Sequence, residues 1–419
     1  MVKTISLLPG VTLRCFPDSR FKQNLLSIQF LRPLKEEEAS LNALFPVVLL
    51  RGCESAPDLQ AITKKLDDLY GAAVGVTCRK VGDYQTTGLS CNFISDRFTL
   101  DEKLLPPMVA FLRDLLFSPL LEKGAFCKDF VDSEKKNLIS AIESQLNNKR
   151  SYALARMMEL MCKDDPFGTP RLGRVSQVEA VTPEVLFAHY QKVLRESPVE
   201  IFYVGEQTPE AVAAALMPLF EGRERAVSYL APQTPFGSTE GQRHEERKEV
   251  AQGRLAMGFV TPITLRDADF AAMQVFNTIF GSGMTSKLFM NIREKLSLCY
   301  DISSGYHGSK GIIAVAAGID FDKEELVKEK ILSELAACQD GNITDEELLS
   351  AKEALCSSLR STHDAPGAIE TYYASGLLSG LNMTPQTYMD KVCAVTKEDV
   401  AAAAKTLQLH TVYFLKGVS

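Results

Sequence analysis

An arginine and a tyrosine seven residues apart form the polar pair of greatest chemical interest in this sequence. Arg293 and Tyr300 bracket the stretch REKLSLCY, which we interpret as the end of a helix. On a helix, two groups at this spacing lie two turns apart and project from the same side. Both side chains donate hydrogen bonds, but when the pair is considered alone, a solvated helix face with Tyr300 at its end is the better explanation.

The histidines do not suggest a metal site, because no two of them are four residues apart on one helix face. The five are His189, His244, His307, His363 and His410. His244 begins a His-Glu-Glu segment that resembles the start of a metallopeptidase motif, but Lys248 stands where a second histidine is needed. We interpret this segment as a polar strand, and His189, beside Tyr190 on an amphipathic helix, as a surface or packing residue.

A glycine-rich segment, GSGMTSK at 281–287, has some of the residues of a phosphate-binding loop. Its spacing differs from Gly-x-x-x-x-Gly-Lys-Ser/Thr, and a single glycine-rich loop is weak evidence for phosphate binding. We therefore predict a turn between two helices at 281–287.

The elements that carry these residues occur twice along the chain. The matched pairs are FLRP at 30–33 with FVTP at 259–262, each 22 residues before a glycine (Gly52 and Gly281), and VEAVTPE at 178–184 with VCAVTKE at 392–398. Within the second pair, Thr182 and Thr396 each precede an acidic residue by two positions, as helix N-caps do.

Each repeat has the same predicted order: a strand, a helix, a hairpin, two or three long helices and a closing strand. The strands are predicted at 24–30 and 254–259, the hairpins at 75–93 and 301–319, and the closing strands at 199–205 and 411–417. This order predicts an α+β fold of two homologous domains, each a largely antiparallel sheet packed against helices. We place the domains at 1–222 and 243–419, with a linker at 223–242 that contains Pro232, Pro235 and Gly237.

Composition excludes several functional classes. The net charge of −7 argues against nucleic acid as a partner, because phosphate binding needs clustered Lys and Arg. No stretch reaches the roughly 18 apolar residues of a membrane span, and the apolar run at the N-terminus is too short for a signal peptide. The ten cysteines are scattered, without a Cys-x-x-Cys pair. We expect them to be reduced and buried, and the protein to be cytoplasmic.

In combination, these segments resemble the pitrilysin/insulinase family of zinc metallopeptidases, specifically its short two-domain members. The resemblance extends along nearly the whole chain and is strongest at 281–304. It continues through PFGTPRLG at 166–173, the segment 178–184 and FYVG at 202–205. The order and spacing of the segments carry the resemblance, and no single segment does.

The family is defined by an inverted His-x-x-Glu-His motif on the first helix, with a third zinc ligand, a glutamate, on a later helix. Aligning the turn that follows the motif with residues 50–53 places Ala43, Pro46 and Val47 at the motif positions. In the family, the third ligand lies seven residues after another glutamate. Glu134 matches that first glutamate, so the ligand position falls on Ala141. None of the side chains at the motif positions or at Ala141 can bind zinc or act as a base. We also expect Pro46 to bend the helix or delay its start. The resemblance thus implies that this chain binds no metal or other cofactor.

In the family, the second half donates an arginine and a tyrosine to the active site. The resemblance implies that Arg293 binds substrate carbonyls and that Tyr300 donates a hydrogen bond to the developing oxyanion. It also implies a heterodimer with a zinc-bearing paralogue, and an unfolded peptide bound as an added strand. On this view the chain is a non-catalytic subunit and no enzyme on its own. Two alternatives stay open: a peptide-binding or scaffold protein that has no peptidase activity in any complex, and an independent hydrolase that uses other residues.

Overall fold

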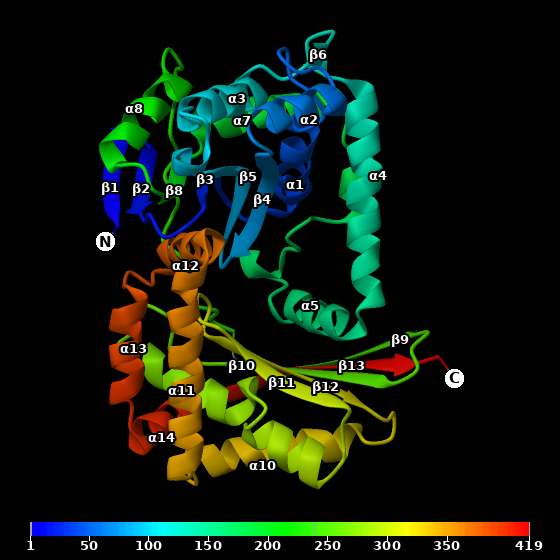
Figure 1. Cartoon of the computed structure of the whole chain (residues 1–419). Helices are drawn as coiled ribbons and strands as arrows, with labels where there is room; N and C mark the ends of the chain where they lie inside the picture. Colours follow the sequence, from blue (N-terminus) through cyan, green and yellow to red (C-terminus); the bar gives the residue numbers. More distant parts are fainter. Residues whose placement is uncertain (1, 239, 419) are drawn as a thin grey trace. The chain divides into compact units, whose positions relative to one another are not determined.

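The computed structural model describes residues 2–238 and 240–418, which form two compact units (Figure 1). Unit 1 comprises Met1–Glu143, Thr169–Pro232 and Asp364–Ala374, and unit 2 comprises Ser144–Gly168, Gln233–His363 and Ser375–Ser419. The units are therefore not two uninterrupted halves of the sequence. Residues 144–168 and 364–374 each belong to the unit built mainly by the other half, whereas we had predicted continuous domains.

Unit 1 is built on a six-stranded sheet with the order β1-β2-β8-β3-β5-β4. Its strands are β1 Lys3–Leu8, β2 Val11–Pro17, β3 Gln23–Pro33, β4 Ala73–Val81, β5 Tyr84–Ile94 and β8 Val199–Gly205. All neighbouring strands are antiparallel except β2 and β8, which are parallel. The nine central residues of β3 are buried, as expected for a strand covered on both faces.

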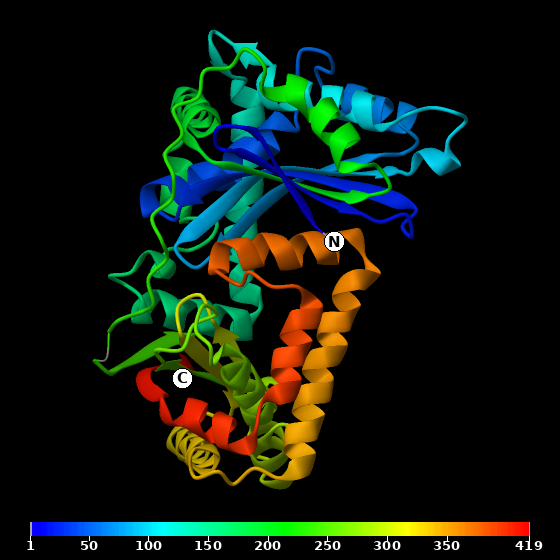
Figure 2. The ribbon, with the colours of Figure 1, turned by 90° about the vertical axis from the view of Figure 1, so that its left-hand side faces the viewer.

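Helices cover one face of this sheet, and the start of α12 lies on the other face (Figure 2). The elements of unit 1 are α1 Glu36–Leu49, α2 Leu59–Asp68, η1 Asp96–Phe98, α3 Leu105–Phe117, β6 Leu121–Glu122, β7 Ala125–Phe126, α4 Lys128–Ser144, α6 Val175–Glu179, α7 Pro183–Glu196 and α8 Pro209–Phe220. The helix α12 spans Pro366–Ser379, of which residues up to Ala374 belong to unit 1.

Unit 2 contains a five-stranded sheet with the order β11-β12-β10-β13-β9. Its strands are β9 Gln242–Lys248, β10 Gly253–Val260, β11 Asp301–His307, β12 Ile312–Ile319 and β13 Gln408–Gly417. Only β13 and β9 run parallel. Read from the opposite edge, this sheet repeats the connectivity of the strands β2, β8, β3, β5 and β4 of unit 1, including its single parallel pair. The predicted duplication and α+β fold are thus confirmed.

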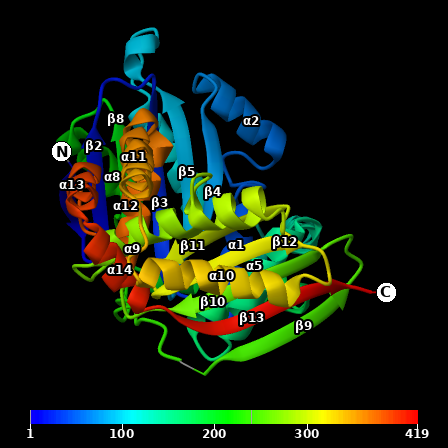
Figure 3. The same cartoon turned by 90° about the horizontal axis from the view of Figure 1, so that it is seen from below.

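The helices of unit 2 lie on both faces of its sheet, with α10 crossing the strands in Figure 3. Its helical elements are η2 Gln145–Asn147, α5 Lys149–Met161, η3 Pro166–Gly168, α9 Phe270–Asn277, η4 Thr278–Ser282, η5 Leu288–Lys295, α10 Glu324–Gln339, α11 Asp345–Ser361, η6 Thr362–Asp364, α13 Pro385–Ala394 and α14 Lys397–Lys405. The predicted N-caps are confirmed: Thr182 accepts from the amide of Val185, and Thr396 from that of Asp399.

The two helices exchanged between the sequence halves are held by different contacts. Methionines of α5 pack on β10, where a Cβ at Gly258 would lie 2.5 Å from the Met161 sulfur. Glu370 of α12 is buried in unit 1 and accepts a hydrogen bond of 2.5 Å from Gln29. Its two carboxylate oxygens also accept from Arg79 of β4, at 2.9 and 2.7 Å. These hydrogen bonds offset the free-energy cost of removing the carboxylate from water.

All ten cysteines are free thiols, as predicted, but they are not all buried. Cys393 is exposed, and Cys78 and Cys127 are partly buried. Cys393 lies near the end of α13, with its sulfur 3.8 Å from that of Cys356 on α11. Burial raises the pKa of the Cys91 and Cys15 thiols, which favours the protonated thiol that packs like a small apolar residue.

Candidate functional site

The helix α1 carries the three positions that our alignment matches to the family's zinc motif. Ala43 and Pro46 are buried and Val47 is partly buried. The helix runs through Pro46 without a break and begins at Glu36. Our expectation of a late start is therefore wrong. Proline removes the N–H that would bind the Asn42 carbonyl, but the Thr87 hydroxyl donates to that carbonyl at 2.6 Å, so the helix keeps its acceptor satisfied.

The Asn42 side chain connects α1 to the sheet and to α7 through buried hydrogen bonds. Its amide donates to Gln85 Oε1 at 2.8 Å, and its Oδ1 lies 2.8 Å from His189 Nε2. Gln85 in turn donates to the carbonyls of Ala39 and Arg171. Burial lowers the pKa of His189 to about 4, so the ring is neutral and donates to Asn42. His189 is thus a packing residue in a satisfied network, as one of our two interpretations proposed.

The helix α4 holds Glu134, which our alignment matches to the glutamate seven residues before the third ligand. Glu134 is buried, and its Oε1 lies 3.3 Å from a guanidinium nitrogen of Arg51, just after α1. Asn137 donates to its other oxygen at 3.1 Å. The folded chain therefore brings the end of α1 close to α4, and the ion pair between Arg51 and Glu134 connects them. Ala141, which our alignment places at the third zinc ligand, is exposed on α4.

These residues do not fit a zinc ion. Alanine, proline and valine have no donor atom, and the carboxylate of Glu134 is already bound to Arg51. In residues 2–238 and 240–418, no group of three or more His, Cys, Asp or Glu side chains is arranged to hold a metal. We therefore derive no metal chemistry for this chain.

The glycine-rich segment of unit 2 connects two helical segments, as predicted. It leads from η4 to η5, and Gly281 is packed so closely that a Cβ there would lie 2.7 Å from the side chains of Leu288 and Ser304. Lys287 is buried and forms an ion pair of 2.8 Å with Glu347 of α11. Its ammonium group therefore binds a carboxylate of the same unit, where a phosphate loop would need it free.

Arg293 and Tyr300 both reach the surface of unit 2. The guanidinium of Arg293 lies 4.5 Å from the Phe289 ring and 3.6 Å from a Glu294 oxygen. Tyr300 is 59% exposed and donates to Asp320 at 2.7 Å. This hydrogen bond raises the pKa of Tyr300, so its phenol is protonated near neutral pH and can donate.

Contrary to our prediction, Arg293 and Tyr300 do not lie on one helix. The helical segment η5 ends at Lys295, and Ser297 adopts a left-handed conformation with φ of 51°. The chain then extends, and the amide of Tyr300 donates to the Gly318 carbonyl at 2.8 Å. Tyr300 thus precedes the edge strand β11, and our placement of both residues on one helix is wrong.

Sequence reasoning missed the contacts that fix these regions. Glu134 and Arg51 are 83 residues apart, and Asn42 and Thr87 are 45 residues apart. No periodic pattern links residues at such distances. The predicted polar strand at His244 is confirmed as β9, whose side chains alternate between partly buried and exposed. None of the helices described here is long and apolar enough to cross a membrane.

The two sheets define a duplicated α+β protein, and residues 2–238 and 240–418 contain no metal centre. The family profile described as "Peptidase M16 inactive domain" matches residues 180–355. A probable inactive metalloprotease of Bacillus subtilis, YmfF, is 29% identical over 409 residues, which cover 97% of this chain and 96% of that protein.

Solved structures show the same architecture along the whole chain. A conserved protein from Enterococcus faecalis superposes with a TM-score of 0.92 at 29% identity and covers 100% of this chain and 99% of its own. A peptidase M16 inactive domain from Pseudomonas fluorescens has a TM-score of 0.80 at 19% identity, with 100% and 98% covered. The chain therefore shares its fold with these proteins and is similar in sequence to a protein described as a probable inactive metalloprotease.

Proposed function

We propose that this chain is the non-catalytic subunit of a heteromeric zinc peptidase. Arg293 would bind carbonyl groups of an extended peptide, and Tyr300 would donate a hydrogen bond to the oxyanion formed at the partner's zinc site. The partner would be a paralogous subunit that carries the His-x-x-Glu-His motif. Zinc would be held by that subunit, because Ala43, Pro46, Val47 and Ala141 supply no ligand.

The accessibility of Arg293 and Tyr300 is the observation that carries this proposal. Tyr300 is 59% exposed, and the Arg293 side chain is 39% exposed. Exposed interactions with Glu294 and Asp320 contribute little to the stability of the fold. Stability alone therefore does not explain why an arginine and a tyrosine stand at these two positions. A protonated phenol and a guanidinium at the surface are suited to bind developing negative charge.

The proposed peptide would bind by adding a strand to a sheet. Among the described strands, β4 pairs only with β5, and β11 pairs only with β12, so each has one edge free of strand pairing. Tyr300 comes directly before β11. A peptide that extends this sheet would pass Tyr300 while its backbone is held by main-chain hydrogen bonds.

The proposal is tested by mixing the purified chain with a zinc-bearing paralogue and measuring hydrolysis of a fluorogenic peptide. Replacing Tyr300→Phe should lower kcat about 10²- to 10³-fold, the usual loss for one oxyanion donor. Arg293→Met should lower kcat/KM strongly. Assembly, measured by analytical ultracentrifugation, should not change, because both variants keep the apolar part of each side chain.

Matched controls are available on exposed surfaces. Tyr229→Phe removes a phenol that is 74% exposed, and Arg247→Met removes an exposed guanidinium on β9. Both controls should retain full turnover. A double Arg293→Met, Tyr300→Phe variant that hydrolyses peptide as fast as the wild type would disprove the proposal. Complexes that form with zinc-bearing paralogues yet never hydrolyse peptide would favour the alternative, a peptide-binding or scaffold protein.

A further inference from the structure

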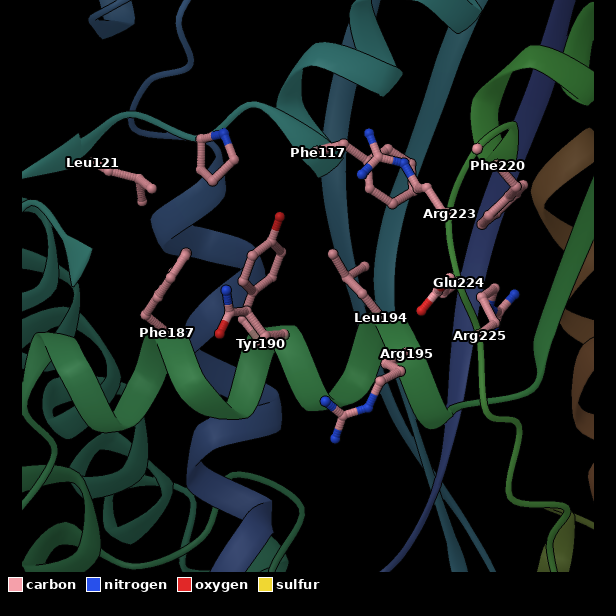
Figure 4. A pocket seen from close by; sticks show the side chains of 13 residues that line it. Phe117, Leu121, Phe187, Tyr190, Leu194, Arg195, Phe220, Arg223, Glu224 and Arg225 are labelled. Carbon is pink, nitrogen blue, oxygen red and sulfur yellow. The ribbon is translucent and has the colours of Figure 1, made fainter. Parts of the chain in front are cut away.

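A cavity of about 510 Å³ opens on the helical side of unit 1 (Figure 4). It lies between the end of α3, the helix α7 and the segment that follows α8. None of the positions discussed above as zinc or peptide residues lines it. Its volume is in the range of pockets that bind small molecules, so the chemistry of its walls is informative.

One side of the cavity is apolar and the other is cationic. Phe187, Tyr190 and Leu194 project from one side of α7, as Figure 4 shows. Across the cavity lie Arg223 and Arg225, on the segment after α8. The Tyr190 hydroxyl is occupied, since it donates to the Leu116 carbonyl at 2.7 Å. The tyrosine therefore offers its ring to the cavity wall and keeps its polar end satisfied.

Arg223 is a cation without an anionic partner. Its guanidinium lies 3.8 Å from the centre of the Phe117 ring, a stacking geometry that leaves the N–H groups at its edge free. No hydrogen bond or ion pair occupies these groups within the described part of the chain. Burial lowers its pKa; the neighbouring Tyr190 opposes this shift, and the positive charge of Arg113 adds to it. An anion bound to the guanidinium would offset both the burial of this charge and its repulsion by Arg113.

Arg225 has unmet donors of its own. One terminal nitrogen donates to the Ser197 carbonyl, and the guanidinium lies 5.6 Å from the Phe220 ring. Its Nε and other terminal nitrogen are buried and have no acceptor in the structure described. A buried N–H without a partner costs about 1–3 kcal/mol. Glu224 is the only acid that lines the cavity, and none of the hydrogen bonds or ion pairs described joins it to either arginine.

We propose that this cavity binds a small aromatic anion, a flat apolar ring that carries a carboxylate or phosphate. The anionic group would bind to Arg223 and Arg225, whose planar guanidinium groups match the geometry of two acceptor oxygens. The ring would stack in the apolar part of the cavity, against Phe187 and Tyr190. This site is independent of the proposed peptidase role, since it uses none of its residues.

Binding of 1-naphthyl phosphate to the full-length chain, measured by isothermal titration calorimetry, tests this proposal. Arg223→Gln should weaken binding about 10- to 100-fold, because a charge-assisted hydrogen bond is lost. Arg20→Gln is the matched control, because Arg20 is exposed, pairs with Asp18 at 2.7 Å and is not among the residues that line the cavity. It should bind as the wild type does, and both variants should keep the wild-type melting temperature.

Two further ligands test the cationic part and the apolar part of the site separately. Inorganic phosphate should bind at least about tenfold more weakly than 1-naphthyl phosphate if the ring contributes by burial. The neutral 1-naphthalenemethanol should also bind more weakly, because it offers no charge to the arginines. The proposal is overturned if 1-naphthyl phosphate shows no binding at millimolar concentration, or binds the Arg223→Gln variant with unchanged affinity.

Discussion

The polar groups around α1 in unit 1 and the pair Arg293 and Tyr300 in unit 2 are held by contacts of opposite kinds. Around α1, the polar groups of Asn42, Thr87 and His189 are buried and satisfied by one another. In unit 2, Arg293 and Tyr300 reach the surface and contact neighbours that are themselves exposed. The same duplicated fold thus uses its polar residues for packing in one region and leaves them accessible in the other.

This difference separates residues that folding explains from residues that it does not. Buried hydrogen bonds are costly to break because the remaining partner is left without water. Exposed ion pairs contribute little and are screened by salt. Stability therefore accounts for the polar groups around α1, and binding to something outside the chain is the better explanation for Arg293 and Tyr300. Substitutions matched between the two regions test this division.

The largest expected effect is a loss of stability in mild acid that depends on His189. Its folded pKa is about 4, below the ordinary value of about 6.5, so the unfolded chain binds a proton first. The stability that depends on neutral His189 is complete above pH ~6.5 and falls as the pH decreases toward 4. Between pH ~7 and ~4.5 the loss should be about 2–3 kcal/mol, measured by urea unfolding.

The control for this pH effect lies at an exposed histidine. His189→Gln keeps an amide donor toward Asn42 and removes the titration, so the stability of this variant should change less over the same pH range. His363→Gln, at an exposed position, should follow the wild type. Equal pH dependence in the wild type and the His189→Gln variant would show that the network around α1 does not control acid stability.

A smaller loss is expected from breaking the ion pair between α1 and α4. Arg51→Met leaves the buried Glu134 with Asn137 alone and should cost about 1–3 kcal/mol in urea unfolding. Adding Glu134→Gln should recover part of this cost, since no charge then remains buried. The matched change in unit 2, Arg293→Met, should stay within about 0.5 kcal/mol. A larger loss at Arg293 than at Arg51 would contradict the division between the two regions.

The sequence predicted the repeated elements well because each one has a local signal. The closing strand at 199–205 appears in the structure with the predicted bounds, and the N-caps at Thr182 and Thr396 also follow local rules. The zinc-motif positions came from alignment to a family, and their assignment is a proposal. Their surroundings could not be predicted, because the residues that meet there are brought together only by the folded sheet.

The exchange of helices between the units was also beyond sequence reasoning. Glu370 binds Arg79 across 291 residues of sequence, and neither residue belongs to a motif. The extended chain before Tyr300 was missed for a local reason. REKLSLCY continues a helical pattern of apolar residues, but the left-handed Ser297 ends the helix there. A non-glycine residue in this conformation costs free energy that packing must offset.

The smallest expected effect concerns Pro46, the proline inside α1. Thr87→Val should cost about 1–2 kcal/mol in urea unfolding, because the buried Asn42 carbonyl loses its donor. In a Pro46→Ala background the alanine amide can donate to that same carbonyl, so Thr87→Val should cost less. The two substitutions should therefore couple by about 1 kcal/mol in a double-mutant cycle.

Unit 2 supplies the matched control for this cycle. The Ser304 hydroxyl donates to the Asn277 side-chain oxygen at 2.7 Å, a buried bond without a proline nearby. Ser304→Ala should destabilise the chain by the same amount with or without Pro46→Ala, because the two sites share no partner. Additive behaviour of Thr87→Val and Pro46→Ala would mean that the threonine does not replace the missing helix donor. Coupling confined to unit 1 would show that the fold accommodates Pro46 through Thr87, independently of any role for Arg293 and Tyr300.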